Sequence, residues 1–334
     1  MTRIEKLCAK GIRRIGSPAR GFRYRKSDGG RVARADLSRI DALKIPPAWK
    51  DVCISSSATA AVQAVGQDAA GRWQYLYHDS HVRLRERKKF HRLAEFAASL
   101  PSMRKTITKD LRLHGLPRER VMACILRILS LSFIRPGSEI YANENGSYGI
   151  ATLRPRHVGV RGDTVVFDFP GKSGVQQHRE IRDRTVARVV RELLKHPGRD
   201  VFKFLSPEGV IVDVKRRDIN LYIKDVMGRN FSAKDFRTWA GTLICACALA
   251  RAQANGNGDK PTKQKLVGAI KETAEALGNT PAVCRSAYIC PLVMTGFEKG
   301  LVIDRYFENV NELMSHRSAS LHPAERSLLK FLKQ

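Results

Sequence analysis

At 334 residues, 43% of them hydrophobic, the chain is long enough for two domains with separate cores and too apolar to be disordered by composition. Its 60 Lys and Arg residues against 32 Asp and Glu residues give a formal net charge of +28. Positive charges in such excess repel one another within the folded protein. They therefore predict a polyanionic partner, of which nucleic acid is the first candidate. The N-terminal "MTRIEKLCAKGIRRIG" lacks the apolar core of a signal peptide, and no apolar run reaches the roughly 18 residues of a membrane span. We therefore expect a cytoplasmic protein without membrane contact.

The chain has seven cysteines, an odd number in isolated positions, which predicts no disulfide framework and reduced thiols. No CxxC pair is present to hold zinc, and His78, His81 and His157 are not spaced as metal ligands. We expect no metal and no other cofactor.

Residues 1–90 are predicted to form a β-rich domain. Within residues 52–78, the runs "AVQAVG" and "WQYLYH" flank a glycine-containing turn, which is typical of a β-hairpin with Trp73, Tyr75 and Tyr77 on one face. The charge-dense run "RLRERKKFHRL" that follows fits either a linker or the start of a helix. We place the domain boundary there, near residue 90.

Residues 91–334 show mainly helical periodicity. "LAEFAASLPSMRKTITKDL" predicts one helix, and the apolar density of "PRERVMACILRILSLSFI" predicts a second, buried one. The segment "HVGVRGDTVVFDFPGKSGVQQHREI" alternates across two turns, which predicts a three-stranded antiparallel sheet with Lys172 at a hairpin tip. Another helix is expected from a cap at Asp183 to "HPG".

Helix caps mark the next predicted elements. "SAKD" resembles a capping box, so Ser232 should start a long apolar helix with Arg237 in its second turn. "ANGNGDKPT" is a loop by composition, and Gly278 should stop the helix after it. Thr280, followed by proline, should start a short helix that carries Tyr288. The resulting fold class is α+β, with a small β-rich N-terminal domain and a larger, mainly α-helical domain that contains a small three-stranded antiparallel sheet.

A tyrosine among cations suggests phosphodiester chemistry. A phenol, with a pKa of about 10, is a poor nucleophile at neutral pH unless cations stabilise its phenolate and the charge that builds on its target. Transfer of a phosphodiester to tyrosine also needs donors on the non-bridging oxygens and an acid for the leaving alkoxide. Composition and spacing alone do not choose these groups, because most of the 60 basic residues are surface charges and a lone tyrosine usually packs a core.

Several separated blocks, in order, resemble one family. "FIRPGSEIYANENGSYGIATLRPRHV", "FPGKSGV", "SAKDFRTWAGT" and "LGNTPAVCRSAY" are similar to the active-site blocks of the poxvirus-type and bacterial type IB DNA topoisomerases. "IPPAW" and "AAGRWQYLYHDSHV" resemble the small DNA-clamping domain of that family. The resemblance covers roughly residues 20–295, and ordered blocks are far more specific than one motif.

This resemblance implies a mechanism on duplex DNA, preferably supercoiled. Tyr288 would form a 3′-phosphotyrosyl bond that is reversed after strand rotation, without ATP or metal. The implied catalytic residues are Tyr288 as nucleophile, Arg135 and Arg237 for transition-state stabilisation, Lys172 as general acid, and Asn279 as a contact to a non-bridging oxygen. The implied DNA contacts are Gln74, Tyr75, Tyr77 and Tyr141. The implied protein is a monomeric bacterial isomerase associated with the nucleoid.

Asn279 departs from the family pattern, because poxvirus members have histidine there. An asparagine amide can donate one neutral hydrogen bond to a phosphate oxygen, but it carries neither charge nor an exchangeable acidic proton. We therefore expect orientation and modest electrostatic stabilisation from Asn279.

Two alternatives stay open from the sequence. Tyrosine recombinases share the catalytic plan but usually carry HxxR, where this chain has Lys234-Asp235-Phe236-Arg237; the N-terminal blocks also favour a topoisomerase. The second alternative is a basic nucleic-acid-binding protein without catalysis, and the complete Arg, Lys, Arg, Tyr set argues against it.

Overall fold

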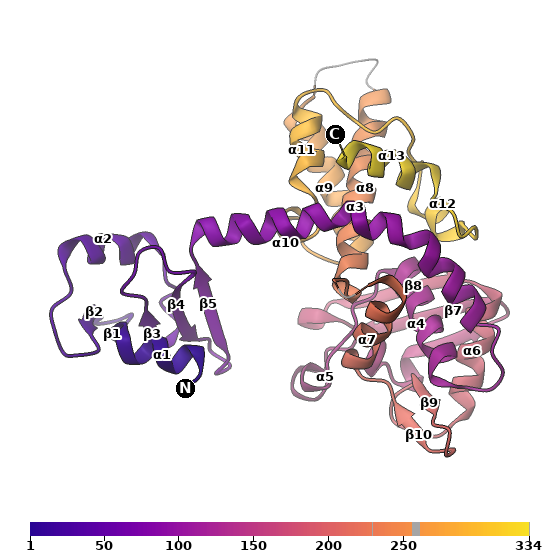
Figure 1. Ribbon diagram of the computed structural model, residues 1–334, viewed down its shortest axis with the longest axis horizontal. Coiled ribbons are helices and arrows are strands. Elements are labelled where there is room, and N and C mark those ends of the chain that lie inside the picture. The colour runs from indigo at the N-terminus through magenta and orange to yellow at the C-terminus, as the bar shows by residue number, and fades with distance from the viewer. Residues whose placement is uncertain (229, 256–260, 334) are drawn as a thin grey trace. The chain divides into compact units, whose positions relative to one another are not determined.

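The computed structural model describes residues 1–228, 230–255 and 261–333. Contacts within it divide the chain into two compact units, Met1–Phe90 and His91–Gln334 (Figure 1). Among the described residues, no helix is both long enough and apolar enough to cross a membrane.

The first unit is built on a five-stranded antiparallel sheet with the strand order β2-β1-β3-β4-β5. Its strands are β1 (Ile12–Ser17), β2 (Gly21–Lys26), β3 (Lys50–Ile54), β4 (Val62–Gln67) and β5 (Trp73–Tyr77). The predicted hairpin is confirmed as β4 and β5, in which Tyr75 lies opposite Val65. The other three strands were not predicted, since β1 and β2 are rich in arginine and carry few apolar residues.

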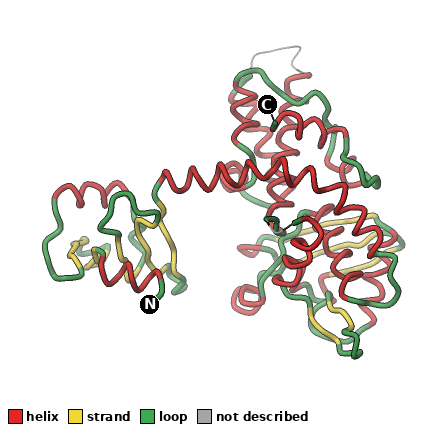
Figure 2. The backbone as a smooth tube through the Cα atoms, viewed as in Figure 1, coloured by secondary structure: helices red, strands yellow, loops and turns green. Residues whose placement is uncertain are grey.

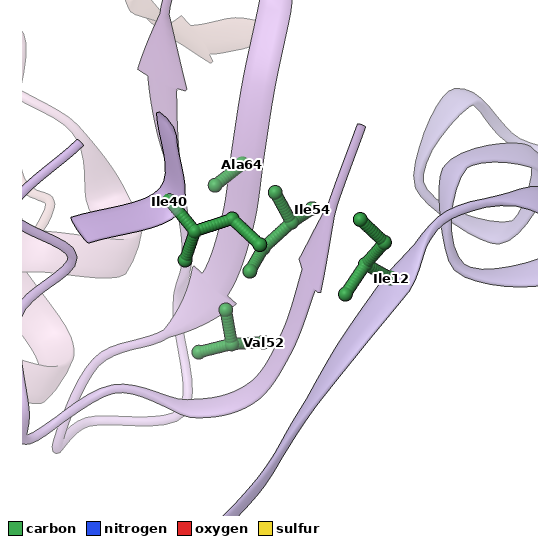
Figure 3. Packing of buried hydrophobic residues seen from close by; sticks show 5 residues of the cluster. All are labelled: Ile12, Ile40, Val52, Ile54 and Ala64. Carbon is green, nitrogen blue, oxygen red and sulfur yellow. The ribbon is translucent and has the colours of Figure 1, made fainter. Parts of the chain in front are cut away.

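Helices α1 (Arg3–Lys10) and α2 (Arg34–Ala42) lie on opposite faces of this sheet (Figure 1). On one face, Ile40 of α2 packs into the cluster drawn in Figure 3, whose strand members are Ile12, Val52, Ile54 and Ala64. On the other face, Leu7 of α1 packs on a cluster that includes Val65. Both faces of the sheet are therefore covered at its centre.

A disulfide joins α1 to the sheet. Cys8 on α1 and Cys53 on β3 are bonded, with their Cα atoms 5.1 Å apart. The expectation of reduced thiols throughout is therefore wrong for this pair. The two residues are 45 positions apart in the sequence, and only the packing of α1 on the sheet brings their sulfur atoms together.

The second unit is mainly helical, with strands confined to two small sheets (Figure 2). Helix α3 (Asp79–Asp110) begins before the division at Phe90, so the charge-dense run near residue 90 lies inside a helix and is not a linker. The other helices are α4 (Arg118–Ser132), α5 (Glu139–Asn145), α6 (Arg184–Lys195), α7 (Arg216–Met227), α8 (Ala233–Ala254), α9 (Lys263–Leu277), α10 (Pro281–Ala287), α11 (Pro291–Glu298), α12 (Val310–Ser315) and α13 (Pro323–Leu332). The strands are β6 (Val158–Arg161), β7 (Thr164–Pro170), β8 (Gln176–Arg182), β9 (Lys203–Leu205) and β10 (Ile211–Asp213).

The predicted helix starts are confirmed, because each depends on neighbours in the sequence. They are Asp183 before α6, Ser232 before α8 and Thr280 before α10. The helix predicted over "PRERVMACILRILSLSFI" is α4, and it is buried along most of its length. Most of the predicted loop "ANGNGDKPT", residues 256–260, lies outside the described residues.

The predicted three-stranded antiparallel sheet is confirmed, with the order β6-β7-β8. The hairpin between β7 and β8 ends in a single 3-10 turn, Lys172–Gly174, which places Lys172 at the tip as expected. Ser173 and Gly174 both have positive φ, 62° and 72°, and so reverse the chain within this short turn.

The turn between α9 and α10 is also close to its prediction. Gly278 ends α9 in the left-handed conformation, with φ 59°, and a β-branched residue there would be strained. Helix α10 ends at Ala287, so Tyr288 follows the helix as its C-cap instead of lying within it as predicted.

Candidate active site

The second turn of α8 places Arg237 at the centre of the candidate site. Arg237 is buried, with 3% of its surface exposed. Its Nη1 donates to the Phe133 carbonyl at the end of α4, and its Nη2 donates to the Leu277 carbonyl at the end of α9, 2.9 Å away. Carbonyls at helix C-termini carry partial negative charge, so they stabilise a cation that burial would otherwise disfavour.

Tyr288 lies against this cation. The Arg237 guanidinium carbon is 5.0 Å from the centroid of the Tyr288 ring. Burial by itself raises the pKa of the phenol, but the charge and hydrogen bonding of Arg237, together with the charges of Arg135 and Lys234, outweigh it and lower the pKa of Tyr288. At a given pH, more of this phenol is therefore ionised than of an exposed tyrosine.

The backbone around Tyr288 is fixed to the same helix. The buried Thr242 hydroxyl of α8 lies 3.1 Å from the Tyr288 carbonyl oxygen and 3.1 Å from the Cys290 amide nitrogen. Gly241 allows this approach, because a Cβ there would lie 3.0 Å from the Cβ and the carbonyl oxygen of Tyr288. Helix α8 therefore positions both Arg237 and Tyr288.

Arg135 reaches the site from the loop after α4. That loop is held in place by a 2.9 Å hydrogen bond from the Ile150 amide to the Arg135 carbonyl. Nη2 of Arg135 lies 3.4 Å from the Gly278 carbonyl and also donates to Oδ1 of Asn279. The Asn279 Nδ2 is buried, and no nitrogen or oxygen acceptor for it is found in the part of the chain that the structure describes.

The positive charges of Arg135 and Arg237 repel each other, because the two guanidiniums donate to the carbonyls of adjacent residues. Burial, with the charge of Arg135 acting in the same direction, lowers the pKa of Arg237 to about 10, while Tyr288 opposes the change. Burial raises the pKa of the nearby Cys284 thiol, although a hydrogen bond with Asn279 and both arginines act against it. An anion bound among these groups relieves the repulsion between the cations.

Within the described residues, the structure brings four of the predicted residues together, and Lys172 is not bonded to them. Arg135, Arg237, Asn279 and Tyr288 form the cluster described above. Lys172 is exposed at its hairpin tip, and within the described residues it makes no hydrogen bond or ion pair with that cluster. Nor do three His, Cys, Asp or Glu side chains gather as metal ligands anywhere in residues 1–228, 230–255 and 261–333.

The residues predicted to contact DNA have different degrees of exposure. In the second unit, Tyr141 on α5 is 46% exposed. In the first unit, Tyr75 is 39% exposed and stacks on Tyr77 at 6.0 Å between ring centroids. Tyr77 also packs on the α1 face of the sheet, and Gln74 donates to Asp68 at 2.8 Å. Tyr75 and Tyr141 are thus the more accessible aromatic side chains of this set.

Comparison with known proteins decides the family. The family model "Eukaryotic DNA topoisomerase I, catalytic core" matches residues 79–299, and "Bacterial DNA topoisomerase IB, N-terminal domain" matches residues 21–68. The chain is 33% identical over 295 residues to DNA topoisomerase 1B of Acanthamoeba polyphaga mimivirus, covering 86% of this chain and 88% of the relative. The chain belongs to the type IB DNA topoisomerases. The predicted enzyme class, an isomerase that acts on DNA, is confirmed.

More distant topoisomerases match as well. DNA topoisomerase 1B of vaccinia virus, strain Copenhagen, is 25% identical over 265 residues, which cover 76% of this chain and 80% of the relative. DNA topoisomerase 1 of Schizosaccharomyces pombe is 27% identical over 164 residues, covering 48% of this chain and 19% of that much longer relative.

Three residues that shape this topoisomerase site were not predicted as site residues. Gly241 and Thr242 hold the Tyr288 backbone, and Lys234 contributes to the lowered pKa of the phenol. All three lie in the block "SAKDFRTWAGT", which carried the family resemblance. The block itself was the only signal, since nothing in its local pattern shows that it packs against residues 288–290.

Proposed function

We propose that this topoisomerase cleaves one strand of duplex DNA by attack of the Tyr288 hydroxyl on a backbone phosphate. The phenol loses its proton to solvent, the new bond joins the tyrosine oxygen to phosphorus, and the bond from phosphorus to O5′ breaks with its electron pair on O5′. The product is a 3′-phosphotyrosyl linkage and a free 5′-hydroxyl. After strand rotation the hydroxyl attacks the phosphotyrosine, so the cycle requires neither ATP nor a metal ion.

The contact between Tyr288 and Arg237 carries this proposal. Partial burial normally raises the pKa of a phenol, whereas here neighbouring cations lower the pKa of the half-buried Tyr288. The Arg237 guanidinium lies 5.0 Å from the centre of the Tyr288 ring, close enough to stabilise a phenolate. The pair supplies the nucleophile and the first cation that phosphoryl transfer to tyrosine requires.

Arg135 and Arg237 stabilise the pentacoordinate phosphate through its non-bridging oxygens. Their geometry supports this role, because they donate to the carbonyls of two successive residues, Gly278 and Leu277, and so converge on one small region. Phosphate oxygens accept the same donors with full negative charge. Replacement of carbonyls by phosphate oxygens also removes the repulsion between the two cations.

Lys172 and Asn279 complete the chemistry. Lys172 gives its proton to O5′ as the bond to phosphorus breaks, and its exposure at a hairpin tip supports contact with a bound duplex. Asn279 donates through Nδ2 to a non-bridging oxygen. The absence of a nitrogen or oxygen acceptor for this buried atom, within the described residues, supports that assignment.

The substrate of this site is duplex DNA, preferably supercoiled, and the enzyme acts as a monomer associated with the bacterial nucleoid. The net charge of +28 supports a phosphate-rich partner. Gln74, Tyr75 and Tyr77 of the N-terminal unit, a clamp in this proposal, contact the duplex, as does Tyr141. The exposure of Tyr75 and Tyr141 supports stacking or phosphate contacts by these two rings.

Covalent capture tests the nucleophile. A nicked or end-truncated duplex, in which the 5′-hydroxyl fragment dissociates after cleavage, traps the phosphotyrosyl adduct for detection on a denaturing SDS gel. We expect a strong adduct for the wild-type enzyme and none for Tyr288→Phe, which lacks the attacking oxygen but retains the ring. Duplex binding by the variant should remain close to that of the wild type.

Tyr306→Phe is the matched control, since it removes another half-buried tyrosine hydroxyl of the same unit that lies outside the candidate site. It should form the adduct at the wild-type rate. An adduct of normal yield with Tyr288→Phe, or its loss only in Tyr306→Phe, contradicts the assignment of Tyr288.

A further inference from the structure

Three arginines from different parts of the chain hold the end of α9. Arg179 on β8 donates to the Ala276 carbonyl at 3.3 Å, and the catalytic candidates Arg237 and Arg135 donate to the next two carbonyls, at 2.9 and 3.4 Å. Arg179 lies on the second strand of the hairpin that carries Lys172 at its tip, opposite Phe167. Strand β8, which follows Lys172 in the hairpin, is thus hydrogen-bonded to the end of α9, just before Asn279.

One buried side chain fits between the two turns that carry these residues. Gln177 on β8 is 7% exposed. A Cβ on Gly171, which directly precedes Lys172, would lie 2.7 Å from the Gln177 Cγ. A Cβ on Gly278, which directly precedes Asn279, would lie 2.4 Å from the Gln177 Oε1. Gln177 therefore touches the backbone next to both proposed catalytic residues.

Hydrogen bonds fix the orientation of this amide. Nε2 of Gln177 lies 3.3 Å from the carbonyls of Val175 and Gln176, within the hairpin itself. Its Oε1 accepts from Nη2 of Arg179 at 3.3 Å, the same atom that donates to Ala276. The amide thus links the hairpin on one side to the end of α9 on the other.

From these contacts we propose that Gln177 is a positioning residue that couples the Lys172 hairpin to the Gly278–Asn279 turn. The proposal rests on the proposed function, in which O5′ must receive a proton from Lys172 at the moment when the phosphate is held by Asn279 and the arginines. Lys172 itself makes no hydrogen bond or ion pair with that cluster in the described residues. Gln177 fixes the position of Gly171, at the base of the Lys172 loop, relative to the Gly278–Asn279 turn that would hold the phosphate.

A substrate that needs no acid provides the test. In a 5′-bridging phosphorothiolate duplex, sulfur replaces O5′ and leaves as a thiolate without taking up a proton, so a defect in general acid catalysis disappears. The duplex is built around a site that the wild-type enzyme cleaves in plasmid DNA. We expect Gln177→Ala to cleave the normal phosphodiester about 10- to 100-fold more slowly, because a displaced Lys172 loses part of the roughly 100- to 10,000-fold that general acid catalysis contributes. It should cleave the phosphorothiolate at nearly the wild-type rate.

Further variants separate positioning from folding. Gly171→Ala introduces a methyl group against Gln177 while the backbone φ of −89° accepts alanine, so it should give the same pattern without altering β8. Lys172→Ala should also be rescued, and Gln177→Ala added to it should slow cleavage no further. Gln176→Ala is the matched control, because this neighbouring glutamine is exposed and bonds to Asp168 instead; it should cleave both duplexes like the wild type.

The outcomes distinguish this inference from the function on which it rests. Absence of any adduct with the wild-type enzyme overturns the proposed function. Rescue of Lys172→Ala without rescue of Gln177→Ala and Gly171→Ala overturns only the coupling by Gln177. Failure to rescue Lys172→Ala overturns both the assignment of Lys172 as the acid and the positioning role of Gln177. A normal rate of Gln177→Ala on the phosphodiester also overturns the positioning role.

Discussion

The pKa of Tyr288 is lowered by positive charges that lie far from it in the sequence. Arg237 and Lys234 come from the first turns of α8, and Arg135 comes from the loop after α4. Arg237 is itself buried, whereas Lys234 is exposed and can be removed without opening the core. Lys234 stands where tyrosine recombinases usually have the histidine of HxxR, and here its charge favours the phenolate.

Lys234→Ala should therefore shift the pH dependence of DNA cleavage. Loss of one positive charge raises the pKa of Tyr288, so the rising limb of the cleavage rate moves to higher pH. We expect a several-fold lower rate near neutral pH and convergence with the wild type in alkaline solution, measured as single-turnover cleavage across pH. Lys224→Ala, an exposed lysine of α7 outside this set of charges, should leave the profile unchanged. A Lys234→Ala profile that overlies the wild type contradicts this electrostatic account.

The sequence could predict the identity of these residues but not their mutual effects. Arg135, Arg237 and Tyr288 were found because each lies in a block that resembles the family. The buried contact of Arg237 with Tyr288, and the approach of Gly241 to the Tyr288 backbone, depend on packing between α8 and the segment after α10. A single sequence carries no local pattern for such long-range contacts.

At the scale of elements, helix α13 contacts helix α8 through the buried carboxylate of Glu325. Glu325 is 1% exposed and accepts two hydrogen bonds from Arg104 of α3, at 2.8 and 2.9 Å. Its Oε1 also lies 3.4 Å from Nε1 of Trp239, two residues after Arg237 on α8. The C-terminal segment thus contributes to the packing behind the candidate site.

Glu325→Ala should destabilise the second unit strongly. It leaves the Arg104 guanidinium largely buried without its counter-charge, and removal of one partner from a buried pair typically costs about 3–5 kcal/mol. Glu325→Gln, which keeps an acceptor, should cost less. Urea unfolding measures both, with Glu298→Ala on the exposed face of α11 as a control expected within about 0.5 kcal/mol of wild type. A free energy of unfolding for Glu325→Ala equal to that of the control excludes this role.

Elements with local signals were predicted well, and elements held by distant contacts were not. The caps at Asp183, Ser232 and Thr280 are set by neighbouring residues, and all three start helices where expected. Helix α1 and strands β1 to β3 are short, and they are held by packing and by the disulfide between Cys8 and Cys53. These elements are stabilised by the assembled sheet, so the alternation of apolar and polar residues within one short segment does not predict them.

For the whole molecule, charge and family membership point to the same partner. The net charge of +28 favours a polyanion, and membership of the type IB topoisomerases specifies DNA. Charge alone does not separate an enzyme from a passive DNA-binding protein. The grouping of Arg135, Arg237, Asn279 and Tyr288 around one small region supports catalysis, since passive binding requires no buried cation beside a phenol.

Relaxation of supercoiled plasmid in the presence of EDTA and without ATP tests the central claim most directly. We expect the wild-type enzyme to convert negatively supercoiled plasmid to relaxed topoisomers, because the phosphotyrosyl bond stores the energy that religation needs. Tyr288→Phe should bind the plasmid and leave its topology unchanged. Equal relaxation by the two proteins, or no relaxation by the wild type, contradicts the account.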